Sequence, residues 1–393
     1  MQFTIVTGLS GAGKTHVIRF LEDAGFFCID NLPPVIIPQL AEMFVSIHGK
    51  YDKIAFVIDS RVGDMIGDLL NNIKILKENG YDCRLLFIDA EDEVLVKICA
   101  AALNRADLLQ RQGKYPSPPG CPEWMGLEIA GVITKKGKNV TNWEIGDEVC
   151  ALLGGGGYAE YVAVKYDMLM PVPKGLTVEE ASALPEAYAT SYLNLFIEGK
   201  LEAGQTAFVP AGASGLASVA IPMAKAFGAR VITSVLSDEI AEQIKDLGAD
   251  VIINSSKECV EEVLENEEKN GTPVSVSMDC LCGEILGKSL PFMARGGYWV
   301  VISTLAGTET NIQLRPLLTK GLHLVGSMLR NRTPEFKAYI LSQLVEKVWP
   351  KIESEEIKPS IYKVLPMEQA LEAHGILERC ENVGKVVLKV QDK

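Results

Sequence analysis

The order of hydrophobic and polar residues divides the chain into three regions. In residues 1–97, short apolar runs alternate with stretches whose apolar residues recur every three or four positions. These patterns predict strands at Phe3–Thr7, Lys53–Ile58 and Arg84–Ile88, and helices at Lys14–Ala24 and Gly63–Asn79. Strands that alternate with helices in this way predict a parallel sheet covered by helices.

The two later regions differ from the first, and from each other, in composition and in the pattern of predicted elements. From Ile98 to about Pro173, glycine and proline are frequent, and short strands at Ile129–Ile133 and Tyr158–Val162 predict a barrel-like, mostly β region. From about Val178 to Leu329 the strand–helix alternation returns, with strands at Thr206–Val209, Arg230–Thr233, Val251–Ile253, Val274–Met278 and Tyr298–Ser303. A long helix is predicted near Phe336–Trp349, and we expect the closing strand, Gly384–Val390, to return to the barrel region.

Composition restricts the function classes. A chain of 393 residues with 48% hydrophobic residues is long enough for two or three domains with their own cores. The net charge of −13 predicts repulsion from nucleic acid and anionic membrane, so neither is an expected partner. The sequence shows neither a membrane-spanning apolar run nor a signal peptide. Nine scattered cysteines are typical of reduced thiols in the cytoplasm, which is the predicted localisation.

A glycine-rich turn follows the predicted strand Thr206–Val209 and precedes a predicted helix, Ser218–Phe227. In a βαβ unit such a turn brings backbone N–H groups to a dinucleotide pyrophosphate, although a purely structural turn is the alternative. The predicted cofactor-binding residues of the turn are Gly212, Ala213, Ser214, Gly215, Leu216 and Ala217. The next strand ends in Ser234–Ser237 without an acidic residue for a ribose 2′-hydroxyl. Ser234 and Ser237 therefore predict NADP(H) rather than NAD(H).

A second nucleotide motif stands near the N-terminus. A complete Walker A signature lies between the first strand and the first helix, with Gly8, Ser10, Gly11, Ala12, Gly13, Lys14 and Thr15 as its predicted site residues. Its backbone and Lys14 would bind the phosphates of ATP or GTP, and the Thr15 hydroxyl would hold Mg²⁺. Asp59, after the strand Lys53–Ile58, is either a second Mg²⁺ ligand or a strand-end cap.

A further set of motifs occurs in order at Ala101–Tyr115, Gly126–Gly131, Gly157–Tyr161, Ala183–Ala187, Asn311–Leu318 and Gly326–Arg330. Through these stretches, residues 98–393 resemble the zinc-independent quinone oxidoreductases of the medium-chain dehydrogenase/reductase superfamily, most closely the branch that contains the p53-inducible quinone reductase. The resemblance implies an α/β fold with a Rossmann-type doubly wound cofactor domain at 188–330. It also implies a GroES-like, barrel-type substrate domain at 98–187 and 331–393, whose first strands we expect to be missing. A partial P-loop α/β segment at 1–97 precedes both.

The same resemblance implies the chemistry. Asn104 and Leu127 stand where zinc-dependent relatives carry their first two zinc ligands, so no metal is expected in the reductase half, and hydride would pass from NADPH directly to a quinone or a similar activated carbonyl or alkene. Asn104 and Tyr115 would face this small-molecule substrate, with Thr190 beside the nicotinamide. The alternatives are a turn residue for Asn104, a surface clamp for Tyr115 and a bond from Thr190 to its own helix. Glu128 is expected to be a structural hydrogen-bond acceptor near the domain junction. A homodimer is implied.

The chain also departs from its closest resemblance. Ala217 replaces the third glycine of the phosphate turn, Ile240 replaces a lysine for the 2′-phosphate, and Ser255 replaces a tyrosine. Loss of a cation and a stacking ring predicts weaker NADPH binding. NADPH is still the preferred cofactor, and equal affinity for NADH would refute that preference.

Residues 8–34 resemble the RapZ/YvcJ family of nucleotide-binding RNase adapters, and this resemblance continues to about Lys97. The basic lid helix and the C-terminal domain of that family are missing, so nucleotide binding is implied but adapter function is not. Both resemblances meet within Asp92–Lys97, which fits either family. We interpret the chain as a fusion at a stretch of shared sequence, whether natural or an artefact of assembly. Alternative functions are an ATP- or GTP-binding regulator that senses NADPH and an inactive hybrid.

Overall fold

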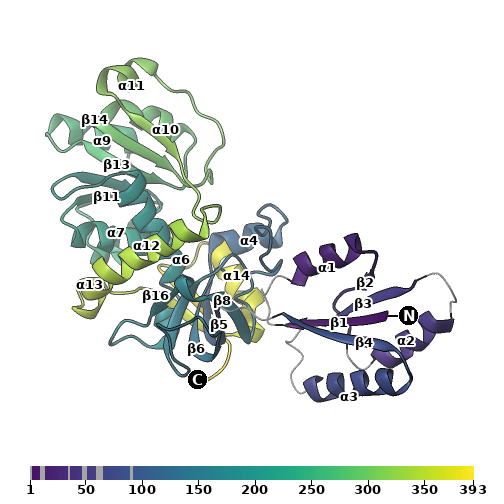
Figure 1. The fold of residues 1–393 in the computed structure, drawn as a ribbon. Coiled ribbons are helices and arrows are strands. Elements are labelled where there is room, and N and C mark those ends of the chain that lie inside the picture. The colour runs from purple at the N-terminus through teal and green to yellow at the C-terminus, as the bar shows by residue number, and fades with distance from the viewer. Residues whose placement is uncertain (1, 9–13, 34–35, 47–50, 59–64, 89–91) are drawn as a thin grey trace.

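The computed structural model describes residues 2–8, 14–33, 36–46, 51–58, 65–88 and 92–393. Within these ranges the paired strands form three sheets, and Figure 1 shows them as three bodies along the chain. The N-terminal body lies beside the central one, while the cofactor domain extends from the opposite side of the central body (Figure 1). The expected α/β architecture is confirmed.

The N-terminal sheet is parallel, with strand order β2-β3-β1-β4 in the described residues. Phe3 and Phe56 stack at 5.7 Å between ring centroids, and Tyr81 meets Phe3 edge-on at 5.6 Å, so aromatic packing fills this core. The expected parallel sheet with helices is confirmed. Its elements are β1 (Gln2–Gly8), α1 (Lys14–Asp23), β2 (Phe27–Ile29), α2 (Ile37–Ser46), β3 (Lys53–Val57), α3 (Met65–Glu78) and β4 (Asp82–Ile88).

The strand β5 (Glu93–Ala102) runs without interruption through the position where the two family resemblances meet. It pairs antiparallel with β6 (Glu128–Lys136) and with β8 (Tyr161–Lys165). The predicted domain boundary after residue 97 falls inside this strand. The alternate residues Val94, Val96 and Ile98, on both sides of that boundary, are buried in the same central core. The stretch that fits both families therefore folds with the substrate domain.

The central, substrate-domain sheet has the order β16-β17-β5-β6-β7-β9, and β8 pairs with β5. The closing strand β17 pairs antiparallel with β5, which confirms its predicted return. The strand predicted at 158–162 lies instead at 161–165, because the Tyr158 N–H donates to the Met125 carbonyl in a turn. The remaining elements are α4 (Arg105–Arg111), β7 (Glu148–Leu152), β9 (Leu169–Pro171), α5 (Val178–Ala181), α6 (Pro185–Tyr192), α12 (Pro334–Lys347), α13 (Trp349–Glu353), β16 (Ile361–Pro366), α14 (Ala370–Glu378) and β17 (Lys385–Lys389).

The cofactor domain is a parallel sheet of order β12-β11-β10-β13-β14-β15, a doubly wound topology in which the strand order reverses between β10 and β13. Ligands of such sheets bind at the carboxyl ends of the strands beside this reversal. The predicted Rossmann-type domain is confirmed. Its elements are β10 (Thr206–Val209), α7 (Ala217–Ala226), β11 (Arg230–Val235), α8 (Asp238–Gln243), β12 (Val251–Asn254), α9 (Val260–Lys269), β13 (Val274–Asp279), α10 (Glu284–Ser289), β14 (Met293–Val301), α11 (Leu314–Lys320) and β15 (His323–Gly326).

Two further properties bear on the setting of the protein. All nine cysteines are free thiols, and four of them, Cys83, Cys99, Cys150 and Cys282, are buried. None of the helices in the described residues combines the length and apolar character that a bilayer crossing needs.

The core of the N-terminal sheet is separate from the cores of the other two sheets, since its buried members all come from residues 3–83. We expect Phe56→Ala to lower the free energy of unfolding of this unit by about 3–5 kcal/mol, the usual loss when a buried ring is removed. Calorimetry should show an earlier transition for the N-terminal unit and an unchanged one for the reductase domains. A single transition that moves as a whole would contradict this independence.

Candidate functional site

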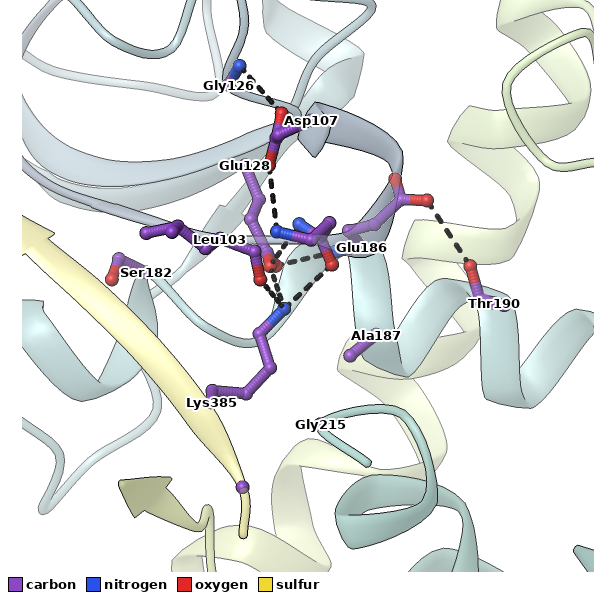
Figure 2. A network of polar contacts seen from close by, with 12 residues as sticks. Leu103, Asp107, Gly126, Glu128, Ser182, Glu186, Ala187, Thr190, Gly215 and Lys385 are labelled. Carbon is purple, nitrogen blue, oxygen red and sulfur yellow. Dashed lines mark hydrogen bonds and ion pairs between the residues drawn. The ribbon is translucent and has the colours of Figure 1, made fainter. Parts of the chain in front are cut away.

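A buried polar network lies where the substrate domain meets the cofactor domain, and Glu128 is at its centre (Figure 2). Glu128 begins β6 and its side chain has no solvent exposure. One carboxylate oxygen accepts hydrogen bonds from Asn104 Nδ2 at 2.9 Å and from Lys385 Nζ at 2.7 Å. The other accepts from the Glu186 N–H at 2.8 Å. The expectation of a structural acceptor at this junction is confirmed.

Lys385 supplies the positive charge of this network. It is the first residue of β17 and is only 5% exposed. Its ammonium also donates to the Leu103 carbonyl at 2.8 Å and to Asn104 Oδ1 at 2.7 Å. All three ammonium hydrogens thus have acceptors, which is the condition for burying such a charge.

The side chain of Lys385 also reaches the cofactor turn. A Cβ atom added at Gly215 would lie 3.0 Å from Lys385 Cδ, so the turn and the lysine stem are in direct packing contact. Asn104, by contrast, uses both ends of its amide within the network. The lysine therefore links the predicted pyrophosphate turn to the buried carboxylate.

Asp107 is a second buried carboxylate on the same side of the site. It lies in the first turn of α4 and accepts from the N–H groups of Asn104 at 2.8 Å and Gly126 at 3.1 Å. Burial raises the pKa of Asp107 to about 6, although these two hydrogen bonds act in the opposite direction.

Glu186 stands in the first turn of α6, and its carboxyl points away from Lys385 toward Thr190 (Figure 2). Thr190 Oγ1 donates to Glu186 Oε1 at 3.4 Å, so the threonine meets a side chain one turn back and not a carbonyl of its own helix. Part of Glu186 reaches solvent, yet protein surrounds its carboxyl closely enough that burial raises its pKa to about 7. The nearby charge of Glu128 adds to this rise.

Tyr115 borders the same region, after the end of α4. The guanidinium of Arg330 lies 4.5 Å from the centre of its ring, and the Tyr115 carbonyl accepts from Arg330. Burial raises the pKa of the Tyr115 hydroxyl, and the charge of Glu186 raises it further. Among the predicted catalytic residues, Asn104 and Thr190 thus connect to the network through Glu128 and Glu186. Tyr115 is coupled to Glu186 only through charge, because the glutamate raises the pKa of the tyrosine hydroxyl.

The predicted cofactor turn lies between β10 and α7. The Gly212 N–H donates to the Ser234 carbonyl, and the Ala217 N–H donates to Ser214 Oγ at 3.1 Å. A Cβ atom at Gly212 would lie 2.5 Å from Thr233 Oγ1, so only glycine fits there. Ala213, Ser214, Gly215 and Leu216 remain partly exposed, whereas Gly212 and Ala217 are buried. This tight turn before a helix N-terminus fits a dinucleotide pyrophosphate.

The adenosine end of the predicted site lies at the end of β11. Ser234 is nearly buried, while Ser237 caps α8 by accepting from the Ile240 N–H at 3.3 Å. Asp238, in the first turn of α8, forms an ion pair with Lys257. An acidic side chain and a cation therefore both stand next to the predicted 2′-phosphate position.

The P-loop prediction falls largely outside the described residues. Ser10, Gly11, Ala12, Gly13 and Asp59 are not among them. The backbone places Gly8 at the end of β1 and begins α1 at Lys14 and Thr15, the strand–turn–helix order that the motif requires.

Sequence reasoning missed the roles of Lys385, Glu186 and Asp107. Glu186 stood within a matching stretch and Lys385 opened the predicted closing strand, but neither had a signal of its own in the pattern. In the described part of the chain, no group of three or more His, Cys, Asp or Glu side chains is arranged to hold a metal ion. Leu127 is buried and apolar, and Asn104 binds Glu128 and Lys385, so these two side chains do not fit zinc.

Comparison with known proteins identifies the parts of the chain. The model of the RapZ-like N-terminal domain matches residues 1–110, that of the alcohol dehydrogenase GroES-like domain matches 90–174, and that of the zinc-binding dehydrogenases matches 215–346. The first two models overlap at residues 90–110, where the two resemblances meet. The overlap is consistent with a fusion of two distinct domains.

A nucleotide-binding protein of Clostridium botulinum is 60% identical over 97 residues, which are 25% of this chain and 33% of that protein. The chain thus spans about a third of the length of the curated relatives it matches. Among solved structures, Escherichia coli quinone oxidoreductase complexed with NADPH has a TM-score of 0.67 at 28% identity, covering 76% of this chain and 92% of its own. An NAD-dependent alcohol dehydrogenase has a TM-score of 0.66 at 28% identity, covering 77% and 92%.

These findings define the class of the larger part of the molecule. It has the GroES-like and Rossmann domains of a medium-chain dehydrogenase/reductase, the fold of oxidoreductases that use nicotinamide cofactors. The smaller part is a RapZ-like N-terminal segment that is similar to nucleotide-binding proteins.

The buried ion pair offers a direct test of the network. Lys385→Met leaves the Glu128 carboxylate buried without its cation, and we expect the free energy of unfolding to fall by about 3–5 kcal/mol. The double variant K385M/E128Q removes both charges and should lose less than K385M alone. Urea denaturation measures all three proteins, and a K385M variant as stable as the wild type would show that the pair is not coupled.

Proposed function

We propose that the chain is a zinc-independent oxidoreductase that transfers hydride from NADPH to a quinone or a similar activated carbonyl or alkene. The observation that supports this most directly is the direct packing of the cofactor turn against the Lys385 network at the domain junction. NADPH supplies the hydride when bound, and the turn from Gly212 to Ala217 would hold its pyrophosphate.

Independence from zinc follows from the donor chemistry at the two positions where the resemblance places zinc ligands. Leu127 offers no donor atom, and the amide of Asn104 is held by Glu128 and Lys385. The substrate must then be activated by hydrogen bonding and by position, not by a Lewis acid. A quinone is suited to this site because its ring accepts hydride without a metal.

The protein residues have separable roles in this proposal. Asn104 and Tyr115 border the substrate, and Thr190 lies beside the nicotinamide. Lys385 and Glu128 hold Asn104 and the start of α6 in place. Because their contacts are buried and complete, the substrate site is formed before the cofactor arrives.

The choice of NADPH rests on Ser234 and Ser237 and on the NADPH in the E. coli neighbour. Lys257 adds a cation next to the predicted 2′-phosphate position, although Asp238 currently pairs with it. We place the protein in the cytoplasm, in keeping with its nine free thiols. Its net charge of −13 disfavours nucleic acid as a partner.

A nucleotide-binding regulator is the second candidate function, and the similarity of residues 1–97 to nucleotide-binding proteins favours it. In that case the P-loop from Gly8 to Thr15 would bind ATP or GTP with Mg²⁺, and the reductase half would only sense NADPH. A dependence of NADPH binding on ATP and Mg²⁺ would distinguish this function from catalysis.

Gly212→Ala tests the cofactor turn, because the added methyl group would lie 2.5 Å from Thr233 Oγ1 and force the turn to move. We expect NADPH affinity to fall about tenfold or more, the scale of overpacking a tight site. NADPH fluorescence measures binding, and the loss of NADPH absorbance with a small quinone measures turnover. Lys14→Ala is the control and should change neither.

A chelator should leave this turnover unchanged. Activity that disappears with the chelator and returns with zinc would refute the metal-free mechanism, and a wild type that binds neither NADPH nor NADH would refute the cofactor assignment.

We further propose a homodimer through β15, the edge strand of the cofactor sheet. Leu314 and Leu318 on the adjacent α11 are 71% and 82% exposed, so an apolar surface accompanies the free edge. Leu318→Asp should shift the protein to monomers in sedimentation velocity. Leu371→Asp, at a residue 79% exposed on α14, is the matched control and should leave a dimer. A monomeric wild type would overturn this proposal.

A further inference from the structure

Glu186 and Thr190 form a pair of hydroxyl and carboxyl groups on one face of α6. The Glu186 N–H is bound to Glu128, which fixes the first turn of the helix. Its carboxyl then projects away from the buried network and meets Thr190 Oγ1 at 3.4 Å (Figure 2). Both side chains are partly exposed, so the pair connects the protein interior to an accessible surface.

The surroundings of Glu186 favour a carboxyl group that carries its proton near neutral pH. Burial has the largest influence, and two carboxylates oppose a further negative charge while two ammonium groups favour it. Together these influences raise the pKa of Glu186 to about 7. The groups that face it are Glu128 on β6, Asp107 on α4, Lys385 on β17, Lys337 on α12, Thr190 on α6 and Tyr115 after α4.

The position of the pair relative to the cofactor comes from Lys385. The stem of this lysine packs against Gly215 of the cofactor turn, while its ammonium lies beside Asn104 and Glu128. The turn, the predicted substrate residue Asn104 and the start of α6 therefore converge within the reach of one side chain. The reacting groups of cofactor and acceptor would lie in this region.

We propose that Glu186 is the proton donor of the hydride transfer and that the Thr190 hydroxyl passes its proton to the acceptor oxygen. This inference rests on the proposed oxidoreductase function and specifies its chemistry. Thr190 Oγ1 donates to the Glu186 carboxylate at 3.4 Å. When Glu186 carries its proton, the carboxyl O–H would donate to Thr190 Oγ1 instead and leave the threonine hydrogen for the acceptor, because a hydroxyl can accept one hydrogen bond while it donates another.

The step is balanced as follows. NADPH, when bound, would supply a hydride from its nicotinamide ring, and negative charge would then develop on the acceptor oxygen. That oxygen takes the Thr190 proton as Thr190 takes the proton of Glu186. NADPH is oxidised by two electrons, the acceptor gains one hydride and one proton, and the Glu186 carboxylate recovers a proton from water on its exposed side.

This arrangement also narrows the acceptor class. Proton donation lowers the barrier most when the reduced oxygen is strongly basic. An α,β-unsaturated ketone, whose reduction forms a basic enolate oxygen, therefore gains more from Glu186 than a small quinone, whose reduced oxygens are more acidic. The structure favours carbonyl-activated alkenes as substrates alongside quinones.

The test is a pH profile of kcat for the full-length protein with a small unsaturated ketone and with benzoquinone. For the wild type, kcat should be constant at low pH and fall about tenfold per unit above the pH of about 7 at which Glu186 ionises. Glu186→Gln should lower kcat for the ketone about 100-fold, lower it less for the quinone, and remove the fall at high pH. Its NADPH affinity should equal that of the wild type.

Three further variants separate this role from a structural one. Thr190→Ser keeps the hydroxyl and should retain the activity, whereas Thr190→Val should reproduce the loss. Glu202→Gln, at an exposed acid outside the site, is the matched control and should be unchanged. If Glu186→Gln does not fold, the two Thr190 variants decide the question, and a fully active Thr190→Val overturns the relay.

The outcomes also separate this inference from the function on which it rests. A Glu186→Gln variant with wild-type rates, or one with uniformly lower rates and an unchanged pH profile, overturns the proton-donor role alone. A wild type that oxidises no NADPH with either acceptor overturns the proposed function and this role together.

Discussion

The ion pair between Glu128 and Lys385 is the interaction on which the arrangement of the reductase part depends. Two charges with almost no exposure to water are held at 2.7 Å, and a buried charge is tolerated only when all its hydrogen-bonding capacity is used. Meeting that demand fixes the end of β5, the start of β6, the start of α6 and the first residue of β17 relative to one another. Removal of either partner would leave the other as an uncompensated buried charge, so each charge requires the other.

The consequences of this pair extend in two directions. Toward the cofactor domain, the stem of Lys385 packs against Gly215, so the position of the phosphate turn depends on the substrate domain. Toward the substrate, Asn104 is held by both charged groups, and the anchored start of α6 directs Glu186 and Thr190 to one side. The desolvation that makes the pair obligatory also raises the pKa values of Asp107 and Glu186.

The strand β5 explains how two unrelated sequences can share one chain. Its residues lie within both the RapZ-like match at 1–110 and the GroES-like match at 90–174. Tertiary structure assigns them to the substrate domain, where Val94 and Val96 pair with β8 and β6. The N-terminal sheet keeps a core of its own, so the fusion leaves each part its own buried apolar residues.

Local pattern was enough to predict many of the elements. Strands β1, β3 and β10, helices α1 and α3, and the glycine turn at Gly212 lie close to where the hydrophobic periodicity placed them, because periodicity records which face of an element is buried. Thr190 and Asn104 were also predicted as site residues, but only through resemblance to a known family. Tertiary structure alone decided that Lys385 meets Leu103, 282 positions away, and that burial raises the pKa of Glu186. Contacts between distant residues and the loss of water around a charge depend on how elements pack, and no local pattern in the sequence encodes either.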